Sequence, residues 1–153
     1  MRKSLLATYI KILIVIIIIA GIIYLAFRVI NNSYSKETYE TIKTNLLLIQ
    51  GKTEVIAQQV EIKEKDAEYI GTKIEEKEND EKIQNLINNN VINLESDDSN
   101  YYCLDESDLG ELGLSNISTD SYYIVDYKQN DVIYVDGIEN ESGNTVYKLS
   151  EME

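Results

Sequence analysis

The chain has 153 residues and a formal net charge of −13, from 14 basic and 27 acidic side chains. All 27 acidic residues follow Ile30 with 10 of the basic ones, so residues 31–153 carry a formal charge of −17. This balance argues against binding nucleic acid, because attraction to phosphate needs clustered Lys and Arg. The chain has no His, which removes the usual catalytic base and the commonest metal ligand. We therefore expect a protein that is not an enzyme and binds no cofactor.

The most apolar stretch, residues 12–30, carries one charge, Arg28, and is long enough to cross a bilayer as a helix. Residues 1–11 hold three basic side chains and no acidic one. The positive-inside rule therefore places this amino-terminal segment in the cytoplasm and the chain after the stretch outside the membrane. A cleaved secretory signal would begin in the same way, but cleavage after either alanine of the stretch would leave a large residue at the −3 position. We expect an uncut, single-pass anchor in the cell membrane.

A helical pattern follows the membrane stretch, and we expect an extracytoplasmic amphipathic helix over residues 31–66. Apolar positions recur there at alternating spacings of three and four residues, which places them along one side of a helix. This stripe consists of Tyr39, Ile42, Leu46, Ile49, Thr53, Ile56 and Val60. Leu47, Leu48 and Val55 widen the apolar side, so the helix should be half buried against a folded domain.

Five members of the stripe form the interaction face that the sequence predicts, namely Ile42, Leu46, Ile49, Ile56 and Val60. A two-stranded coiled coil on the same stripe is an alternative, although its register lasts only about three heptads. Thr53 interrupts that register. Packing on the chain's own domain and pairing with another chain both stay open at this point.

Residues 67–94 are predicted to form a charged linker and one short helix. Between residues 61 and 82 charged side chains dominate and apolar ones show little periodicity, which is typical of a solvated connection. The helix is expected from Asp80, its N-cap, to Asn89. Its apolar face consists of Ile83, Leu86 and Ile87.

Residues 95–153 are richer in β-forming residues and predict a small antiparallel sheet of three or four strands. The candidate strands are Tyr101–Leu104, Tyr122–Tyr127, Val132–Val135 and Thr145–Leu149. The second and third are separated by a short polar segment, which is the pattern of a hairpin. Because a sheet must bury its apolar face against another layer, we expect the long helix to cover it. The predicted fold class is α+β.

Two turns are expected within this sheet domain. Asp105 followed three residues later by Asp108 predicts an acidic cap, opening a helical turn that ends near Gly110 or Gly113. Asp136-Gly137 is expected to turn the chain after the third strand, with a loop from residue 139 to 144 before the last strand.

Clustered carboxylates are the chain's main candidates for chemistry. Ca²⁺ sites need several carboxylates and carbonyls that converge from one loop, but no cluster here has the D-x-[DN]-x-[DN]-G pattern. The same groups suit glycoside hydrolysis poorly, because the chain has no Trp to form a sugar platform. A solvated acidic surface is the simpler interpretation, so we expect no metal site. The clusters are Asp97 with Asp98, Asp105 with Glu106 and Asp108, and Asp136 with Glu139.

Cys103 and the tyrosines have structural interpretations. Cys103 stands beside two tyrosines in a strand candidate, so it is expected to be a small core residue rather than a nucleophile. Seven of the 12 tyrosines fall between residues 101 and 147, and pairing across strands explains them more simply than a ligand site.

The combination of anchor, amphipathic helix and terminal sheet resembles the type IV pilins and type II secretion pseudopilins, particularly divergent pilin-like proteins of low-GC Gram-positive bacteria. The residues that carry the resemblance are Thr44–Lys52, Tyr123–Tyr127, Val132–Tyr134, Gly137 and Tyr147–Ser150. The family's processing site, a Gly followed by an apolar residue and Thr-Leu-x-Glu, is replaced here by Leu5–Lys11. The chain thus resembles a divergent member that lacks the prepilin cleavage motif.

The resemblance implies a membrane-anchored subunit that mediates protein–protein assembly on the extracytoplasmic side. Its expected partners are the membrane, other pilin-like or envelope proteins, or further copies of itself. The alternative is a bitopic coiled-coil scaffold of the cell envelope. No catalytic, cofactor-binding or metal-binding residue is predicted.

Overall fold

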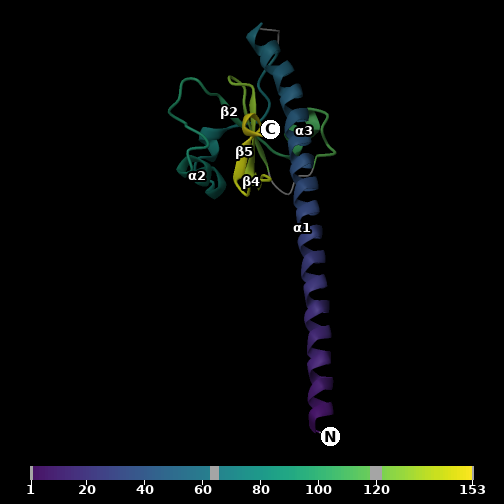
Figure 1. Ribbon diagram of the computed structural model, residues 1–153. Helices are drawn as coiled ribbons and strands as arrows, with labels where there is room; N and C mark the ends of the chain where they lie inside the picture. The colour runs from purple at the N-terminus through teal and green to yellow at the C-terminus, as the bar shows by residue number, and fades with distance from the viewer. Residues whose placement is uncertain (1, 63–65, 118–121, 153) are drawn as a thin grey trace. The chain divides into compact units, whose positions relative to one another are not determined.

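The computed structural model describes residues 2–62, 66–117 and 122–152, with the backbone alone between residues 30 and 37. The chain divides into two units, Met1–Thr38 and Tyr39–Glu153. Helix α1 spans Arg2–Glu61 and therefore contributes to both units (Figure 1). The predicted α+β class is confirmed, because an apolar amino-terminal helix is followed by a small antiparallel sheet.

The first unit consists of the amino-terminal part of α1. Residues Arg2–Val29 form a candidate membrane span, in which no part of the most apolar window is buried within the protein. A helix of 28 residues is about 42 Å long at a rise of 1.5 Å per residue. Because a bilayer's hydrocarbon core is about 30 Å thick, this segment is long enough and apolar enough to cross it.

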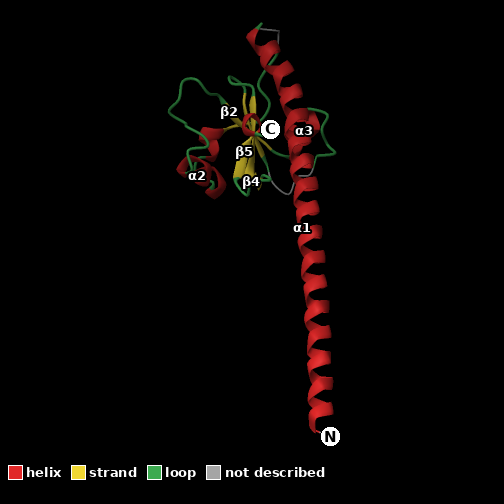
Figure 2. Cartoon of the chain, in the orientation of Figure 1, coloured by secondary structure: helices red, strands yellow, loops and turns green. Residues whose placement is uncertain are grey.

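The second unit contains a five-stranded antiparallel sheet in the order β1-β2-β3-β4-β5. Every strand therefore lies beside its neighbour in sequence, so the sheet is a meander. The strands are β1 Thr72–Lys73, β2 Tyr101–Leu104, β3 Tyr123–Asp126, β4 Asp131–Glu139 and β5 Thr145–Lys148. Shorter elements around them are η1 Ile74–Lys77, α2 Glu81–Asn88, α3 Glu106–Glu111 and η2 Leu149–Glu151 (Figure 2).

Residues Tyr39–Glu61 of α1 and helix α3 cover one face of the sheet. Leu46 and Ile49 of α1 are fully buried and belong to the same cluster as Tyr123 and Val125 of β3 and Leu109 of α3. Burying side chains of this size stabilises a fold by about 1.5–3 kcal/mol each. The expectation that the long helix covers the sheet is confirmed for this part of α1.

The other face of the sheet is also covered, which the sequence analysis did not anticipate. Ile124 and Ile133, which alternate with the residues of the first face, pack with Ile83 and Leu86 of α2 and with Ile74 of η1. Figure 1 shows α2 and α3 on opposite sides of the strands. Since all four residues of β3 are buried, the sheet forms the middle layer of three.

Two expectations about the connections are wrong. The segment expected to be a solvated linker contains β1, which pairs with β2 at Thr72↔Cys103, and the buried Ile74. Charged residues both precede and follow Ile74, so its place in the core has no periodic signal in the sequence.

The chain also does not turn at Asp136-Gly137, because β4 continues to Glu139. Gly137 has a φ of +68° and lies where the register with β5 shifts, between Ile133 and Ile138. A β-bulge with a left-handed glycine uses the same residues as a tight turn. The turn to β5 comes later, where Asn140 N–H donates to the Asn144 carbonyl at 2.9 Å.

The remaining elements agree with the sequence. Asp80 caps α2, and its carboxylate accepts the Lys82 N–H at 2.9 Å. Asp105 and Asp108 form a reciprocal capping box at the start of α3, and Gly113 with a φ of +76° follows its end. Strands β3 and β4 form the predicted hairpin, with Tyr123 opposite Tyr134.

Candidate functional site

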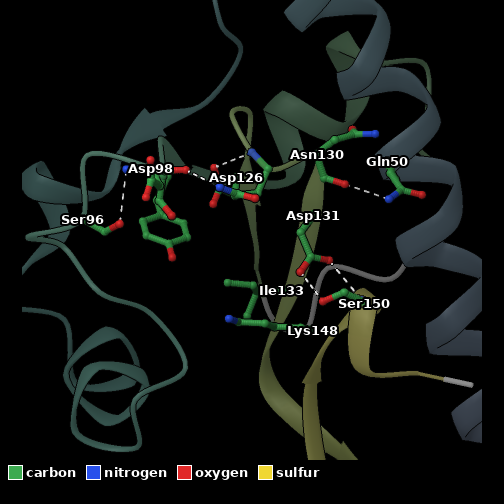
Figure 3. A pocket seen from close by; sticks show the side chains of 12 residues that line it. Gln50, Ser96, Asp98, Asp126, Asn130, Asp131, Ile133, Lys148 and Ser150 are labelled. Atoms are coloured by element: carbon green, nitrogen blue, oxygen red, sulfur yellow. Dashed lines mark hydrogen bonds between the residues drawn. The ribbon is translucent and has the colours of Figure 1, made fainter.

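A cleft with a volume of about 600 Å³ lies in the second unit, at the end of the sheet where β3 turns into β4 (Figure 3). Its walls come from α1, the loop before β2, the β3–β4 turn and the end of β5. Most of its lining is polar. The lining residues are Gln50, Ser96, Asp98, Ser99, Tyr101, Asp126, Gln129, Asn130, Asp131, Ile133, Lys148 and Ser150.

Asp126 is the most buried carboxylate of the cleft, at 3% exposed. Its Oδ1 accepts the backbone N–H groups of Asn100 at 2.9 Å, Lys128 at 3.1 Å and Gln129 at 3.2 Å. A buried carboxylate needs such donors to replace the water that it loses on folding. Asp126 therefore connects the β3–β4 turn to Asn100, at the end of the loop that precedes β2.

Asp131 stands opposite Asp126 in the hairpin register. Its Oδ1 accepts the N–H of Val132 at 2.9 Å and that of Ser150 at 3.1 Å, and its Oδ2 accepts the Ser150 hydroxyl at 2.5 Å. These bonds fix η2 to the start of β4. Asp126 and Asp131 are thus both engaged in structural hydrogen bonds.

Two more side-chain contacts tie the rim of the cleft together. Gln50 of α1 donates to the Asn130 carbonyl at 2.8 Å, and Gln129 donates to the Asp98 carbonyl at 2.7 Å (Figure 3). Lys128 Nζ donates to the carbonyl of Asp97. Gln50, Gln129 and Lys128 thus connect α1 and the β3–β4 turn to neighbouring segments through hydrogen bonds to backbone carbonyls.

A second, more acidic cleft of about 480 Å³ lies between α1, α3 and the segment before β1. Asp66, Glu68, Asp108 and Glu111 contribute carboxylates to it. Burial raises the pKa of Asp108, whose carboxylate accepts the Asp105 N–H at 2.9 Å in the capping box. Within the described residues, no group of three or more His, Cys, Asp or Glu side chains is arranged to hold a metal ion.

The other carboxylate clusters singled out in the sequence have partners of their own. Asp136 forms an ion pair with Lys82 at 2.8 Å. The Asp98 N–H donates to the Ser96 hydroxyl at 3.2 Å within its own loop. The clusters are therefore loop and cap residues of separate elements, and the fold does not bring them together.

Cys103 is buried, which confirms its expected place in the core. Burial raises the pKa of its thiol to about 11. The thiolate is the reactive form of cysteine, so this thiol is poorly suited to act as a nucleophile near neutral pH.

The tyrosines form structural groups, as expected. The Tyr123 and Tyr134 rings lie 5.7 Å apart across β3 and β4. Tyr127 contacts Tyr102 at 5.3 Å and Tyr69 at 4.5 Å between ring centroids. The Tyr127 hydroxyl accepts the Ile70 N–H at 3.1 Å and donates to the Ile70 carbonyl at 2.8 Å. These contacts attach the segment before β1 to the sheet.

The predicted interaction face is divided by the fold. Leu46 and Ile49 are fully buried in the domain's own core, Ile42 and Ile56 pack partly buried against it, and Val60 is half buried. Leu46 and Ile49 are therefore inaccessible to another chain. Binding of a partner by the more exposed members stays a prediction.

Leu47, Leu48 and Val55 do not widen this stripe, since all three are exposed. They form part of a separate surface on the other side of α1, together with Ile62. The signal for that surface is in the sequence, because Leu48, Val55 and Ile62 are seven residues apart.

Comparison of the chain with protein-family models, with curated proteins and with solved structures gives no match in any of the three.

Proposed function

We propose that this protein is a non-enzymatic, single-pass membrane subunit whose domain, Tyr39–Glu153, assembles with other envelope proteins outside the cell membrane, as pilin-like proteins do. The observation that carries the proposal is that the single helix α1 contributes both a candidate membrane span and core residues of the small domain. Its residues Arg2–Val29 are a candidate membrane span, and its residues Leu46 and Ile49 belong to the core of the small domain. An anchor that is also a core helix suits a protein that holds its domain at the membrane surface.

The polar clefts support the same reading. In the larger of the two clefts, the carboxylates of Asp126 and Asp131 are bonded to backbone N–H groups and a hydroxyl of the domain itself. Catalysis by carboxylates needs at least one group placed to exchange a proton with a substrate. A domain whose carboxylates fix its loops is better suited to presenting a stable binding surface than to catalysis.

The orientation is proposed from charge. The amino end carries Arg2, Lys3 and Lys11 without an acidic residue, which favours retention in the cytoplasm. The acidic part of the chain then lies on the extracytoplasmic side. The resemblance to pilins and pseudopilins gives the proposed class of partner.

A coiled-coil scaffold built on the stripe from Tyr39 to Val60 is less well supported. Leu46 and Ile49 are the centre of that stripe, and both are fully buried against the sheet. A second chain would have to displace the sheet in order to reach them.

The test is thiol labelling of the full-length chain in intact cells. Ser142→Cys lies in the exposed β4–β5 turn and Ser4→Cys in the exposed amino end. A membrane-impermeant maleimide is expected to label Ser142→Cys in intact cells and Ser4→Cys only after permeabilisation. The unchanged chain, with its buried Cys103, is the background control. Labelling of Ser142→Cys only after permeabilisation, or a chain that alkaline carbonate releases from membranes, would contradict the proposal.

The mature amino terminus, determined by mass spectrometry, tests the pilin-like part. A start at Met1 or Arg2 is expected for a permanent anchor. A start within residues 5–12 would instead indicate a processed pilin.

A further inference from the structure

The outer side of α1 in the second unit carries an apolar face that the domain does not cover. Within the described part of Tyr39–Glu153, the large hydrophobic side chains that remain exposed are Leu47 at 50%, Leu48 at 42%, Val55 at 52% and Ile62 at 69%. All four lie on α1 or directly after its last residue. Single exposed apolar residues are ordinary, but their confinement to one side of one helix marks an interaction surface.

The face has the spacing of a helix-pairing seam. Thr44, Leu48, Gly51, Val55, Gln58 and Ile62 follow one another at spacings of four and three residues, and none of them is charged. At 3.6 residues per turn, the mean direction of this seam lies roughly 170° around the helix from the buried stripe. Ile62 continues the helical geometry, since its N–H donates to the Gln58 carbonyl at 3.0 Å. The sheet and a second helix can therefore contact α1 at the same time.

We propose that this seam pairs with the same seam of a second copy of the chain, in parallel and in register. The inference rests on the proposed function, because it takes the shared membrane as the reason that the two copies meet. Leu48, Val55 and Ile62 would occupy the a positions of a short two-stranded coiled coil, where β-branched residues favour dimers. Gly51 would occupy a d position, and no atom lies within 4 Å of a Cβ built on it, so a second backbone can approach closely there.

The charges beside the seam select the parallel arrangement. In a parallel pair, residues at g positions face those at the following e positions, which places Glu54 opposite Gln59 and Leu47 opposite Lys52. In an antiparallel pair, Glu54 would face Glu54 and Lys52 would face Lys52. Like charges in such positions are repulsive, so only the parallel pair avoids them.

The size of the seam favours a second copy over a free partner. Three a-position side chains make an interface far smaller than the roughly 1,200 Å² that a stable complex in solution buries. Two anchors in one membrane raise the effective concentration of the two seams, which makes a small contact sufficient. The occupant that this geometry fits is therefore a chain that is anchored in the same way.

The test is disulfide formation in the full-length chain, kept in its membrane. Val55→Cys and Ile62→Cys are each expected to give a covalent homodimer under mild oxidation, because each position faces its own counterpart. Ser142→Cys, which is also exposed but lies in the β4–β5 turn, is the matched control and should stay monomeric. The unchanged chain should stay monomeric as well, since Cys103 is buried.

A charge within the seam should separate the pair. Leu48→Glu in the Ile62→Cys chain is expected to lower the yield of homodimer by about tenfold, the factor that corresponds to 1.4 kcal/mol. Ser142→Glu adds the same charge outside the helix and should leave the yield unchanged. Circular dichroism of both variants should match that of the parent, because neither side chain is buried.

Three results would overturn the inference. They are the absence of homodimer from both seam cysteines, homodimer that is insensitive to Leu48→Glu, and crosslinking to a different protein in place of a second copy. In each case retention of the chain in carbonate-washed membranes would leave the proposed anchored function standing. Release of the chain from the membrane would remove that function independently of the seam.

Discussion

At the scale of single residues, the domain depends on tyrosine hydroxyls and aspartate carboxylates that bind backbone groups. Tyr127 is the clearest case, since its hydroxyl both donates to and accepts from Ile70 while its ring packs on two other tyrosines. It joins residues that are 57 positions apart in the chain. Removing its hydroxyl therefore measures how much these hydrogen bonds contribute to the free energy of unfolding.

Tyr127→Phe is expected to lower the free energy of unfolding by about 1–3 kcal/mol, because it leaves the Ile70 N–H and carbonyl without their partner while the ring contacts persist. Thermal or urea unfolding of the chain in detergent, followed by near-UV circular dichroism, measures the effect. Tyr101→Phe is the control, since its hydroxyl has no hydrogen bond within the described residues and it is only partly buried. Equal stability of the Tyr127 variant and the parent would contradict a role for the hydroxyl.

The same tyrosines predict alkaline sensitivity. Burial raises the pKa values of Tyr102, Tyr122, Tyr123 and Tyr127 above the ordinary value of 10.0. A group whose pKa is raised on folding contributes stability below its unfolded pKa and loses it as the pH rises toward the folded pKa. The free energy of unfolding should therefore be constant from neutral pH to about pH 9 and fall above about pH 10.

Unfolding curves recorded at steps of pH, with phenolate absorbance followed in parallel, check this expectation. The buried phenols should ionise together with unfolding rather than before it. Tyr127→Phe should show a shallower loss of stability above about pH 10. Stability that stays level through this range would show that the phenols are not held in their neutral form by the fold.

At the scale of elements, the sequence predicted most of the fold through its patterns. The stripe on α1, the caps Asp80 and Asp105, and the strand at Tyr101–Leu104 were each visible as spacing or as residue type. Strand β1 was not, because two residues without an alternating pattern join the sheet through backbone bonds to β2. The pair Asp136-Gly137 predicts a turn, but a left-handed glycine suits a β-bulge equally well, and the sequence does not distinguish the two.

Two neighbouring leucines of α1 should contribute very differently to the free energy of unfolding, because they differ in burial and not in residue type. Leu46 is fully buried and Leu47 is half exposed. Leu46→Ala is expected to lower the free energy of unfolding by about 2–5 kcal/mol, as buried leucines do. Leu47→Ala should change it by less than about 0.5 kcal/mol.

The same unfolding measurement compares the two variants directly, since they differ by one position on one helix. A similar loss of stability in both would mean that the helix does not pack on the sheet through the Leu46 side. The comparison is best made at low protein concentration in detergent, where pairing of seams contributes least.

At the scale of the whole molecule, the sequence was informative about the anchor and least informative about the sites. An apolar run is visible in the sequence itself, and among the residues that the structure describes one helix, near the amino terminus, is long and apolar enough to span a membrane. The polar cleft depends on Gln50, Asp98 and Asp131, which come from distant parts of the chain. Only the folded sheet brings them to one cleft, so no local pattern could predict which residues line it.

Deletion of residues 1–38 is expected to release the protein from membranes while the domain stays folded, because the chain divides at Thr38 and Tyr39. Carbonate extraction measures the first effect, and the melting curve of the purified domain measures the second. A shorter deletion of residues 1–8, which keeps the apolar stretch, is the control and should stay in the membrane fraction. Loss of the cooperative melting transition in the longer deletion would show that the domain needs the anchor in order to fold.

The order of the elements along the chain has a consequence for biosynthesis. Leu46 and Ile49 are made early, but much of the sheet that buries them lies beyond residue 100, with Val132 of β4 in the same cluster. At 5–20 residues per second, Val132 is added about 4–17 s after Leu46. Through that interval both sides of α1 are uncovered, and the nascent helix has two apolar surfaces instead of one. In the nascent chain, the stripe from Tyr39 to Val60 is therefore an apolar surface to which a holding chaperone or the membrane surface can bind before β4 is made.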